Sequence, residues 1–368
     1  MSEVIASKAV ASEIVASGVV ASEVIAVVGA TGSGKSALAD ALALALDGEV
    51  ISADSMQVYR GMDIGTAKLP AGERSVPYHC IDLVNPDVFY TAALYQRDAR
   101  AAIKDIRARG RIPVMCGGTG LYLRAALDDF VFDKSRAGGG RRENLENLDN
   151  HDNHENDFEN NRANHELRAE LTAQAEAMGK GAFHALLAKR DPASAALIHP
   201  NNLRRVIRAF ELLAANTTYA QQQAGFSSYK AFYSTCYLGI EVSPAVLYEV
   251  IDRRVDALLE AGLLGEAHGL VAAGYKDAPG FSQAIGYKEL LGVITGSGDL
   301  KTAAEQIKQA TRRYAKRQRT WFGRDNRIRW IDATDLHKER LAGTLAAEEF
   351  TRILLARTLA TLEQQLRA

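Results

Sequence analysis

The chain has 368 residues, of which 47% are hydrophobic and 24% are charged, enough for one large or two moderate domains with a packed core. Its three separated cysteines, Cys80, Cys116 and Cys236, indicate neither a disulfide framework nor a zinc site and favour a cytoplasmic protein. No stretch approaches the roughly 18 apolar residues of a membrane helix, and the first residues do not resemble a signal peptide.

The net charge of −1 hides a separation of charge along the chain. Between Glu143 and His165 there are seven acids and one base, so the rest of the chain carries +5. A basic body of this kind is compatible with a polyanionic partner. Asparagine recurs at every third position in the same region, and this polar tract cannot bury an apolar face. We therefore predict a disordered loop over about residues 137–165, followed by helices over 167–187 and from Pro192 onward.

The N-terminal half alternates strands and helices. Residues 1–23 carry a degenerate ten-residue repeat and are predicted to be a disordered extension. The apolar runs 24–28, 49–52 and 112–116 read as buried strands, with helices predicted over 36–46 and about 92–109. A further short strand is expected over 237–242. This alternation predicts an α/β fold with a parallel sheet and helices on both faces.

The first strand leads into a loop that matches G-x-x-x-x-G-K-[ST]. The loop comprises Gly29, Ala30, Thr31, Gly32, Ser33, Gly34, Lys35 and Ser36. Its glycines let backbone N–H groups and a helix N-terminus face phosphate oxygens. Lys35 is expected to bridge phosphates, and the Ser36 hydroxyl to hold Mg²⁺. The motif predicts phosphate or diphosphate binding without separating kinases, GTPases and transferases.

Asp54 follows the second strand. A carboxylate at the C-terminal end of such a strand faces the ligand crevice of the sheet. It is placed to accept a proton or to organise Mg²⁺ through water, although the position also suits an ordinary helix cap.

Five motifs in order resemble the bacterial tRNA dimethylallyltransferases. They are the loop just described, Ser52-Ala-Asp-Ser-Met-Gln-Val-Tyr-Arg-Gly-Met-Asp-Ile-Gly-Thr-Ala-Lys68, Cys116-Gly-Gly-Thr-Gly-Leu-Tyr122, His199-Pro-Asn-Asn202 with the arginines that follow it, and Gln283-Ala-Ile-Gly-Tyr-Lys-Glu289. The resemblance implies a P-loop NTPase-like core over 24–130 and 199–330. It also implies a small helical insertion domain over 131–198, which leaves a helical tail over 331–368.

The resemblance also implies an activity and roles for individual residues. The dimethylallyl group of dimethylallyl diphosphate would move to N6 of the adenosine 3′ of the anticodon, in tRNAs that read codons beginning with U. Asp54 would be the general base, Arg254 would clamp the diphosphate beside Lys35, and Thr119 would touch the reacting nucleotide. The residues expected to contact tRNA are Asp54, Ser55, Met56, Gln57, Arg204, Arg205, Arg208, Gln283, Gly286, Tyr287 and Lys288. Ala30 and Asn202 depart from the pattern, since Pro and Asp are usual there, which puts any charged role of Asn202 in doubt.

A basic stretch near the C-terminus supports an RNA partner. Residues 307–324 hold seven bases and no acid, with aromatic residues interleaved. Arg312, Lys316 and Arg319 share one helical face, and the first two are predicted to contact the tRNA. The expected ligands are therefore Mg²⁺, dimethylallyl diphosphate and a tRNA anticodon stem-loop, bound by a monomer. A small-molecule kinase that consumes ATP, an enzyme that prenylates free adenine nucleotides, and a non-catalytic RNA-binding NTPase remain alternatives.

Overall fold

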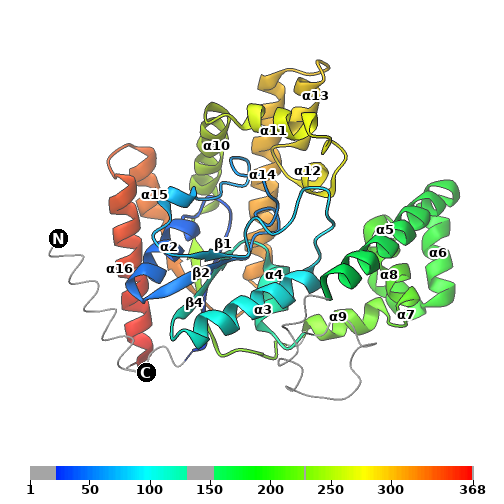
Figure 1. Cartoon of the computed structure of the whole chain (residues 1–368), viewed down its shortest axis with the longest axis horizontal. Helices are drawn as coiled ribbons and strands as arrows, with labels where there is room; N and C mark the ends of the chain where they lie inside the picture. Colours follow the sequence, from blue (N-terminus) through cyan, green and yellow to red (C-terminus); the bar gives the residue numbers. More distant parts are fainter. Residues whose placement is uncertain (1–21, 131–152, 228, 367–368) are drawn as a thin grey trace. The chain divides into compact units, whose positions relative to one another are not determined.

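The computed structural model describes residues 22–130, 153–227 and 229–366 (Figure 1). Within these residues, six strands form one parallel sheet in the order β3-β2-β4-β1-β5-β6. The strands are β1 (Val24–Gly29), β2 (Gly48–Ser52), β3 (Tyr78–His79), β4 (Ile112–Gly117), β5 (Thr235–Glu241) and β6 (Ile328–Asp332). The predicted α/β class with a parallel P-loop sheet is confirmed.

The chain divides into two compact units, and the first contains the whole sheet. This unit runs up to Asp128 and resumes at Ala231. Its helices are α2 (Lys35–Ala45), α3 (Ala92–Ala108), α4 (Gly120–Leu127), α10 (Pro244–Glu260), α11 (Leu263–Ala272), α12 (Pro279–Gln283), α13 (Leu291–Ile294), α14 (Leu300–Phe322), α15 (Thr334–Leu341) and α16 (Ala347–Leu366).

Strand β1 lies in the middle of the sheet and is buried on both faces. Val24, Ala26 and Val28 point into a core shared with α3 and α4, whereas Ile25 and Val27 point into a core shared with α2, α10 and α16. Parallel strands covered on both sides read as continuous apolar runs, which explains why the sequence located this strand so directly. Because β1 ends in the phosphate loop, the two cores fix the position of the loop.

The C-terminal residues belong to the first unit. The predicted tail boundary at residue 331 falls inside β6, and α16 packs against α2 (Figure 1). Leu354 and Leu362 of α16 are buried in the same core as the helix that follows the phosphate loop. The segment 331–368 therefore completes the sheet domain, because its apolar helix face covers α2.

The second unit is helical and spans Asp129–Lys230. Its helices are α5 (Asn153–Met178), α6 (Lys180–Arg190), α7 (Pro192–Leu197), α8 (Leu203–Ala214) and α9 (Tyr219–Ser227). Phe183 and Phe210 meet in its core with ring centroids 4.8 Å apart. The unit extends beyond the predicted end at residue 198, because α8 packs on α5 and α6 and α9 packs on α7 and α8.

Two details of this unit differ from the sequence-based expectation. The helix predicted over 167–187 is interrupted at Gly179, which has φ 79° and separates α5 from α6. The loop predicted over 137–165 is helical from Asn153, since a packed helix propagates readily into polar sequence. Residues 137–152, and 1–21 of the predicted extension, lie outside the described residues. None of the helices described here has the length and apolar character needed to cross a membrane.

Candidate functional site

The phosphate loop joins β1 to α2. Gly32 and Gly34 have φ values of 82° and 93°, in the left-handed region that glycine adopts without strain. A Cβ on Gly34 would lie 2.9 Å from Cε1 of Phe350 in α16, so packing also excludes a side chain there. Turn geometry and the C-terminal helix together hold the loop in the shape that the motif predicts.

Lys35 begins α2 and turns back over this loop. Its Nζ donates to the backbone oxygen of Ala30 at 3.4 Å. Burial lowers the pKa of Lys35, while Cys116 and Asp54 nearby raise it. The ammonium group of Lys35 is therefore largely removed from water, and a buried positive charge attracts an anionic ligand strongly.

Asp54 stands two residues beyond the end of β2. Its Oδ1 accepts the N–H of Met56 at 2.9 Å, which fixes the turn. Among the described residues no donor contacts Oδ2, so this oxygen is left to face a ligand. The sequence also suited Asp54 to an ordinary capping role, and the structure shows that this role uses only one oxygen of the carboxylate.

Thr119 ties the ends of β2 and β4 together. Its Oγ1 accepts the N–H of Ser55 at 3.1 Å, and its own N–H donates to the oxygen of Ala53 at 3.2 Å. A Cβ on Gly117 would lie 2.1 Å from that same oxygen of Ala53. The close approach of the two strand ends brings Thr119 beside the Asp54 turn, as its predicted role requires.

Arg254 lies on α10, far from the other site residues in sequence. Burial lowers its pKa, and the negative charge of Asp54 offsets part of that effect. Arg254 also lowers the pKa of Lys35, so all three charged groups lie within electrostatic range of one another. No ion pair to Arg254 occurs among the described residues, which leaves its guanidinium group free to clamp an anion.

Helix α14 contributes a residue that sequence reasoning missed. The side-chain amide of Gln318 is 4% exposed; its Oε1 accepts the N–H of Thr31 at 2.8 Å, and its Nε2 donates to the oxygen of Gly118 at 3.0 Å. Gln318 therefore links the phosphate loop to the turn that carries Thr119.

Tyr314 and Trp321 lie one turn to either side of Gln318 on α14. Burial raises the pKa of Tyr314 to about 12, with Asp54 contributing, while hydrogen bonds to Thr119 and Gln318 oppose the shift. A Cβ on Gly120 would lie 2.0 Å from Nε1 of Trp321. The spacing of these three residues, i, i+4 and i+7, is the sequence signal that marks this face of α14.

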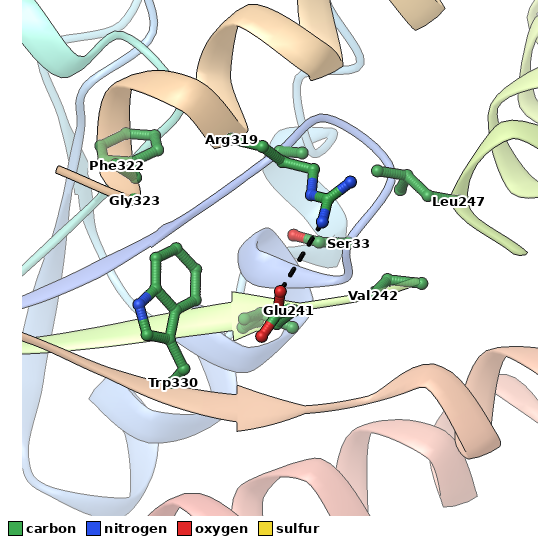
Figure 2. Close-up of a pocket in the computed structure, with 10 residues that line it drawn as sticks. Ser33, Glu241, Val242, Leu247, Arg319, Phe322, Gly323 and Trp330 are labelled. Carbon is green, nitrogen blue, oxygen red and sulfur yellow. Dashed lines mark ion pairs between the residues drawn. The ribbon is translucent and has the colours of Figure 1, made fainter. Parts of the chain in front are cut away.

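A cavity of about 240 Å³ opens beside the loop (Figure 2). Apolar side chains of Leu247, Phe322 and Trp330 form much of its wall, and Arg319 lies 3.7 Å from Glu241 within it. Ser33 also lines it, and its buried hydroxyl has no hydrogen-bond partner within the part of the chain that the structure describes. The cavity borders the phosphate loop at Ala30 and Ser33, and Lys35, Asp54 and Arg254 do not line it.

The predicted RNA-contacting residues fall into different environments. Gln283 and Lys288 are exposed, whereas Ser55, Met56 and Gln57 are half-buried. Tyr287 is fully buried in the first core, with its hydroxyl donating to Glu266 at 2.6 Å. Gly286 is buried as well, because this part of the motif packs inward, so Gln283 and Lys288 are the exposed residues of this stretch that were expected to contact RNA.

The basic stretch of α14 is partly neutralised by acids from other elements. Arg312 forms an ion pair with Asp252, and Lys308 with Asp256 at 2.8 Å, both on α10. Within residues 307–324, the exposed cations without a carboxylate partner among the described residues are Arg313, Lys316 and Arg317 on α14, and Arg324 just after its end. Lys316 is therefore exposed without a carboxylate partner in the described part of the chain, whereas Arg312 is paired with Asp252.

Arg204, Arg205 and Arg208 belong to the second unit. Arg204 and Arg205 are exposed at the start of α8, and Arg208 pairs with Glu211 at 3.0 Å. Asn202 caps this helix and its side chain accepts from the N–H of Arg205 at 3.4 Å. An Asn serves this role as well as an Asp does, which explains how the departure at residue 202 is tolerated.

The described residues contain no group of three or more His, Cys, Asp or Glu side chains that could hold a metal ion. Ser36 is exposed at the start of α2, next to Cys116, and Asp54 supplies a carboxylate within electrostatic range of Lys35. Mg²⁺ is commonly bound by one or two protein oxygens together with phosphates and water. The donor set therefore fits an ion that arrives with a diphosphate, and does not fit a metal held by protein alone.

The parallel sheet and its glycine-lysine loop, with Lys35 and Arg254 near it, are typical of P-loop proteins, a class that binds phosphorylated ligands. A family model described as IPP transferase matches residues 57–325. A tRNA dimethylallyltransferase of Symbiobacterium thermophilum is 41% identical over 89% of this chain and 93% of its own length. Another, from Geobacillus thermodenitrificans, is 42% identical over 85% and 91%. The chain belongs to the IPP transferase family.

Solved structures agree with this membership. A tRNA isopentenylpyrophosphate transferase from Staphylococcus epidermidis is 35% identical and matches 94% of this chain and 98% of its own, with a TM-score of 0.59. A eukaryotic dimethylallyltransferase acting on tRNA is 30% identical and matches 86% of this chain and 75% of its own, with a TM-score of 0.67. The predicted family and fold are both confirmed.

Proposed function

We propose that this chain is a tRNA dimethylallyltransferase that acts on N6 of the adenosine 3′ of the anticodon, in tRNAs that read codons beginning with U. Its relatives of that name are about 40% identical over most of their length. The observation that carries the proposal is that Arg254 and Asp54 lie within electrostatic range of Lys35, whose Nζ donates to Ala30 of the phosphate loop. Two cations suit a departing diphosphate, and one carboxylate suits a nucleophile that loses a proton.

The departing diphosphate is stabilised by the loop and the two cations. As the bond between the allylic carbon and the diphosphate oxygen breaks, its electron pair remains with the oxygen and negative charge grows there. Backbone N–H groups of the loop, Lys35 and Arg254 would oppose that charge, and the support for this is that Lys35 folds back over the loop and Arg254 lies within electrostatic range of Lys35. Their low solvation strengthens the effect, because electrostatic attraction increases as water is excluded.

Asp54 acts on the incoming adenine. N6 forms a bond to the allylic carbon and becomes acidic, so it transfers one proton to the free Oδ2 of Asp54. Thr119, which accepts the N–H of Ser55 in the Asp54 turn, would orient the nucleotide. The adenosine must leave its stack to reach these groups, and an anticodon loop permits this at lower cost than a duplex.

Mg²⁺ would be held by Ser36, with Asp54 contributing through water. When bound, it would supply further positive charge to the departing diphosphate. Exposed cations of α14 and of α8 would bind tRNA phosphates, giving affinity without choice of sequence. We further propose a monomer that works in the cytoplasm, where the free cysteines stay reduced.

The test incubates the purified chain with Mg²⁺, labelled dimethylallyl diphosphate and unmodified tRNA, followed by nucleoside analysis. Label in N6-substituted adenosine next to the anticodon supports the proposal. Parallel incubations with AMP, and with labelled ATP, test the nucleotide-prenylating and kinase alternatives. Label that enters AMP and spares tRNA would overturn the proposal, as would tRNA bound tightly but never modified.

Asp54→Asn isolates the role of the base. The amide oxygen still accepts from Met56, so the turn persists while proton acceptance is lost. We expect kcat to fall by a factor of about 10² to 10⁴, with tRNA binding within a few-fold of normal. Asp87→Asn, an exposed position on the same unit, is the matched control. Normal turnover of Asp54→Asn would remove Asp54 from the mechanism.

A further inference from the structure

A single carboxylate in the first unit accepts four hydrogen bonds. Glu266, on α11, receives the backbone N–H groups of Asp63 at 2.9 Å, Ile64 at 2.8 Å and Gly65 at 3.1 Å. The hydroxyl of Tyr287 donates to the same carboxylate at 2.6 Å. Four bonds use nearly all the acceptor capacity of a carboxylate. Among the described residues no Lys or Arg pairs with Glu266, so backbone and phenol donors alone satisfy its charge.

The loop held by Glu266 leads directly to the Asp54 segment. The backbone oxygen of Thr66, next to Gly65, accepts a hydrogen bond from Nε2 of Gln57 at 3.2 Å. The other end of the Gln57 amide accepts from Oγ of Ser52 at 2.8 Å, at the end of β2. Displacement of the loop would therefore move Gln57, which lies within the stretch 54–57 that we expect to contact tRNA.

Tyr287, the side-chain partner of Glu266, belongs to the other stretch that we expect to contact tRNA. The ring of Tyr287 lies against Gly65, where a Cβ would come within 2.4 Å of the ring. Exposed Gln283 and Lys288 flank this buried tyrosine in the sequence. Glu266 thus joins the stretches 54–57 and 283–288 through one carboxylate, although neither stretch contains it.

We propose that Glu266 is a positioning residue for tRNA recognition. It holds the two stretches at a fixed separation, so that both contact one anticodon loop, and it touches neither substrate itself. The proposal rests on the proposed function. It assigns Glu266 no part in donor binding, because its contacts exclude the phosphate loop, Lys35 and Arg254.

The test compares Glu266→Gln and Tyr287→Phe with wild type in steady-state prenyl transfer, and measures tRNA and diphosphate binding directly. The glutamine amide keeps the shape of the side chain but replaces an acceptor oxygen with a donor facing an N–H group. We expect the KM for tRNA to rise about ten-fold in Glu266→Gln and less in Tyr287→Phe. The KM for the donor and the Kd for diphosphate should stay within two-fold. Glu260→Gln, exposed at the end of α10, is the control.

The split between the two substrates separates positioning from a general structural role. A variant that is merely less stable would lose donor and tRNA binding together at temperatures where it begins to unfold, and assays well below that temperature would restore both. An unchanged tRNA KM in Glu266→Gln, or an equal rise in both KM values, would overturn the inference while leaving the proposed function intact. A wild-type protein that does not prenylate tRNA would instead refute the proposed function.

Discussion

Removal of the Gln318 side chain tests whether α14 controls the phosphate loop. In Gln318→Ala, the N–H of Thr31 loses its acceptor and the oxygen of Gly118 loses its donor. Each buried hydrogen bond contributes about 0.5–1.5 kcal/mol, so we expect the free energy of unfolding to fall by about 1–3 kcal/mol. If about 1.4 kcal/mol of this is lost ordering of the loop, the Kd for diphosphate rises about ten-fold.

Two measurements follow this change. Calorimetric titration with diphosphate and Mg²⁺ gives the Kd, and denaturant unfolding gives the free energy of unfolding. Gln309→Ala, at an exposed position on the same helix, is the matched control and should leave both values unchanged. A Gln318→Ala protein with wild-type diphosphate affinity and wild-type stability would refute the link between α14 and the loop.

Two further results are expected. Glu49 is 1% exposed, and hydrogen bonds from Arg109, His79 and Arg111 lower its pKa to about 2 in spite of its burial. Because the folded pKa lies below the unfolded value, ionised Glu49 stabilises the protein above about pH 4.5, and this stabilisation is lost as the pH falls toward 2. Denaturant unfolding at pH 7 should therefore show that Glu49→Gln has a free energy of unfolding lower by on the order of 1–3 kcal/mol. The difference from wild type should shrink as the pH is lowered. Raising salt from about 50 to 200 mM should weaken tRNA binding far more than donor binding, and equal weakening would contradict a phosphate-contacting surface.

The sequence located the site residues that lie in or next to strand ends. The loop after β1 was found from its motif, and Asp54 after β2 from a rule of parallel sheets, in which the C-terminal ends of strands share one edge. Thr119, which follows β4, came from the family resemblance. Arg254 came only from the family resemblance, since nothing in the pattern of α10 separates it from the adjacent Arg253. The structure places Arg254 near Asp54, whereas Arg253 bonds to Glu249 on the surface.

Residues that act through tertiary contacts could not be identified from the sequence. Gln318 is one of many polar side chains in α14. Its role depends on hydrogen bonds to two backbone groups, which lie more than 190 residues away in the chain. The apparent charge of α14 was overestimated for the same reason, because Asp252 and Asp256 approach it from α10. Long-range neutralisation of this kind cannot be read from a local count of charges.

The packing of Phe350 on Gly34 has a consequence for biosynthesis. The phosphate loop ends at Ser36, yet its supporting helix α16 begins at Ala347, more than 300 residues later in the chain. Central strand β1 also waits for β5, which starts at Thr235. The helical unit Asp129–Lys230, by contrast, is one unbroken run and can fold while it emerges from the ribosome. The phosphate loop therefore lacks the support of Phe350 until α16 has been synthesised.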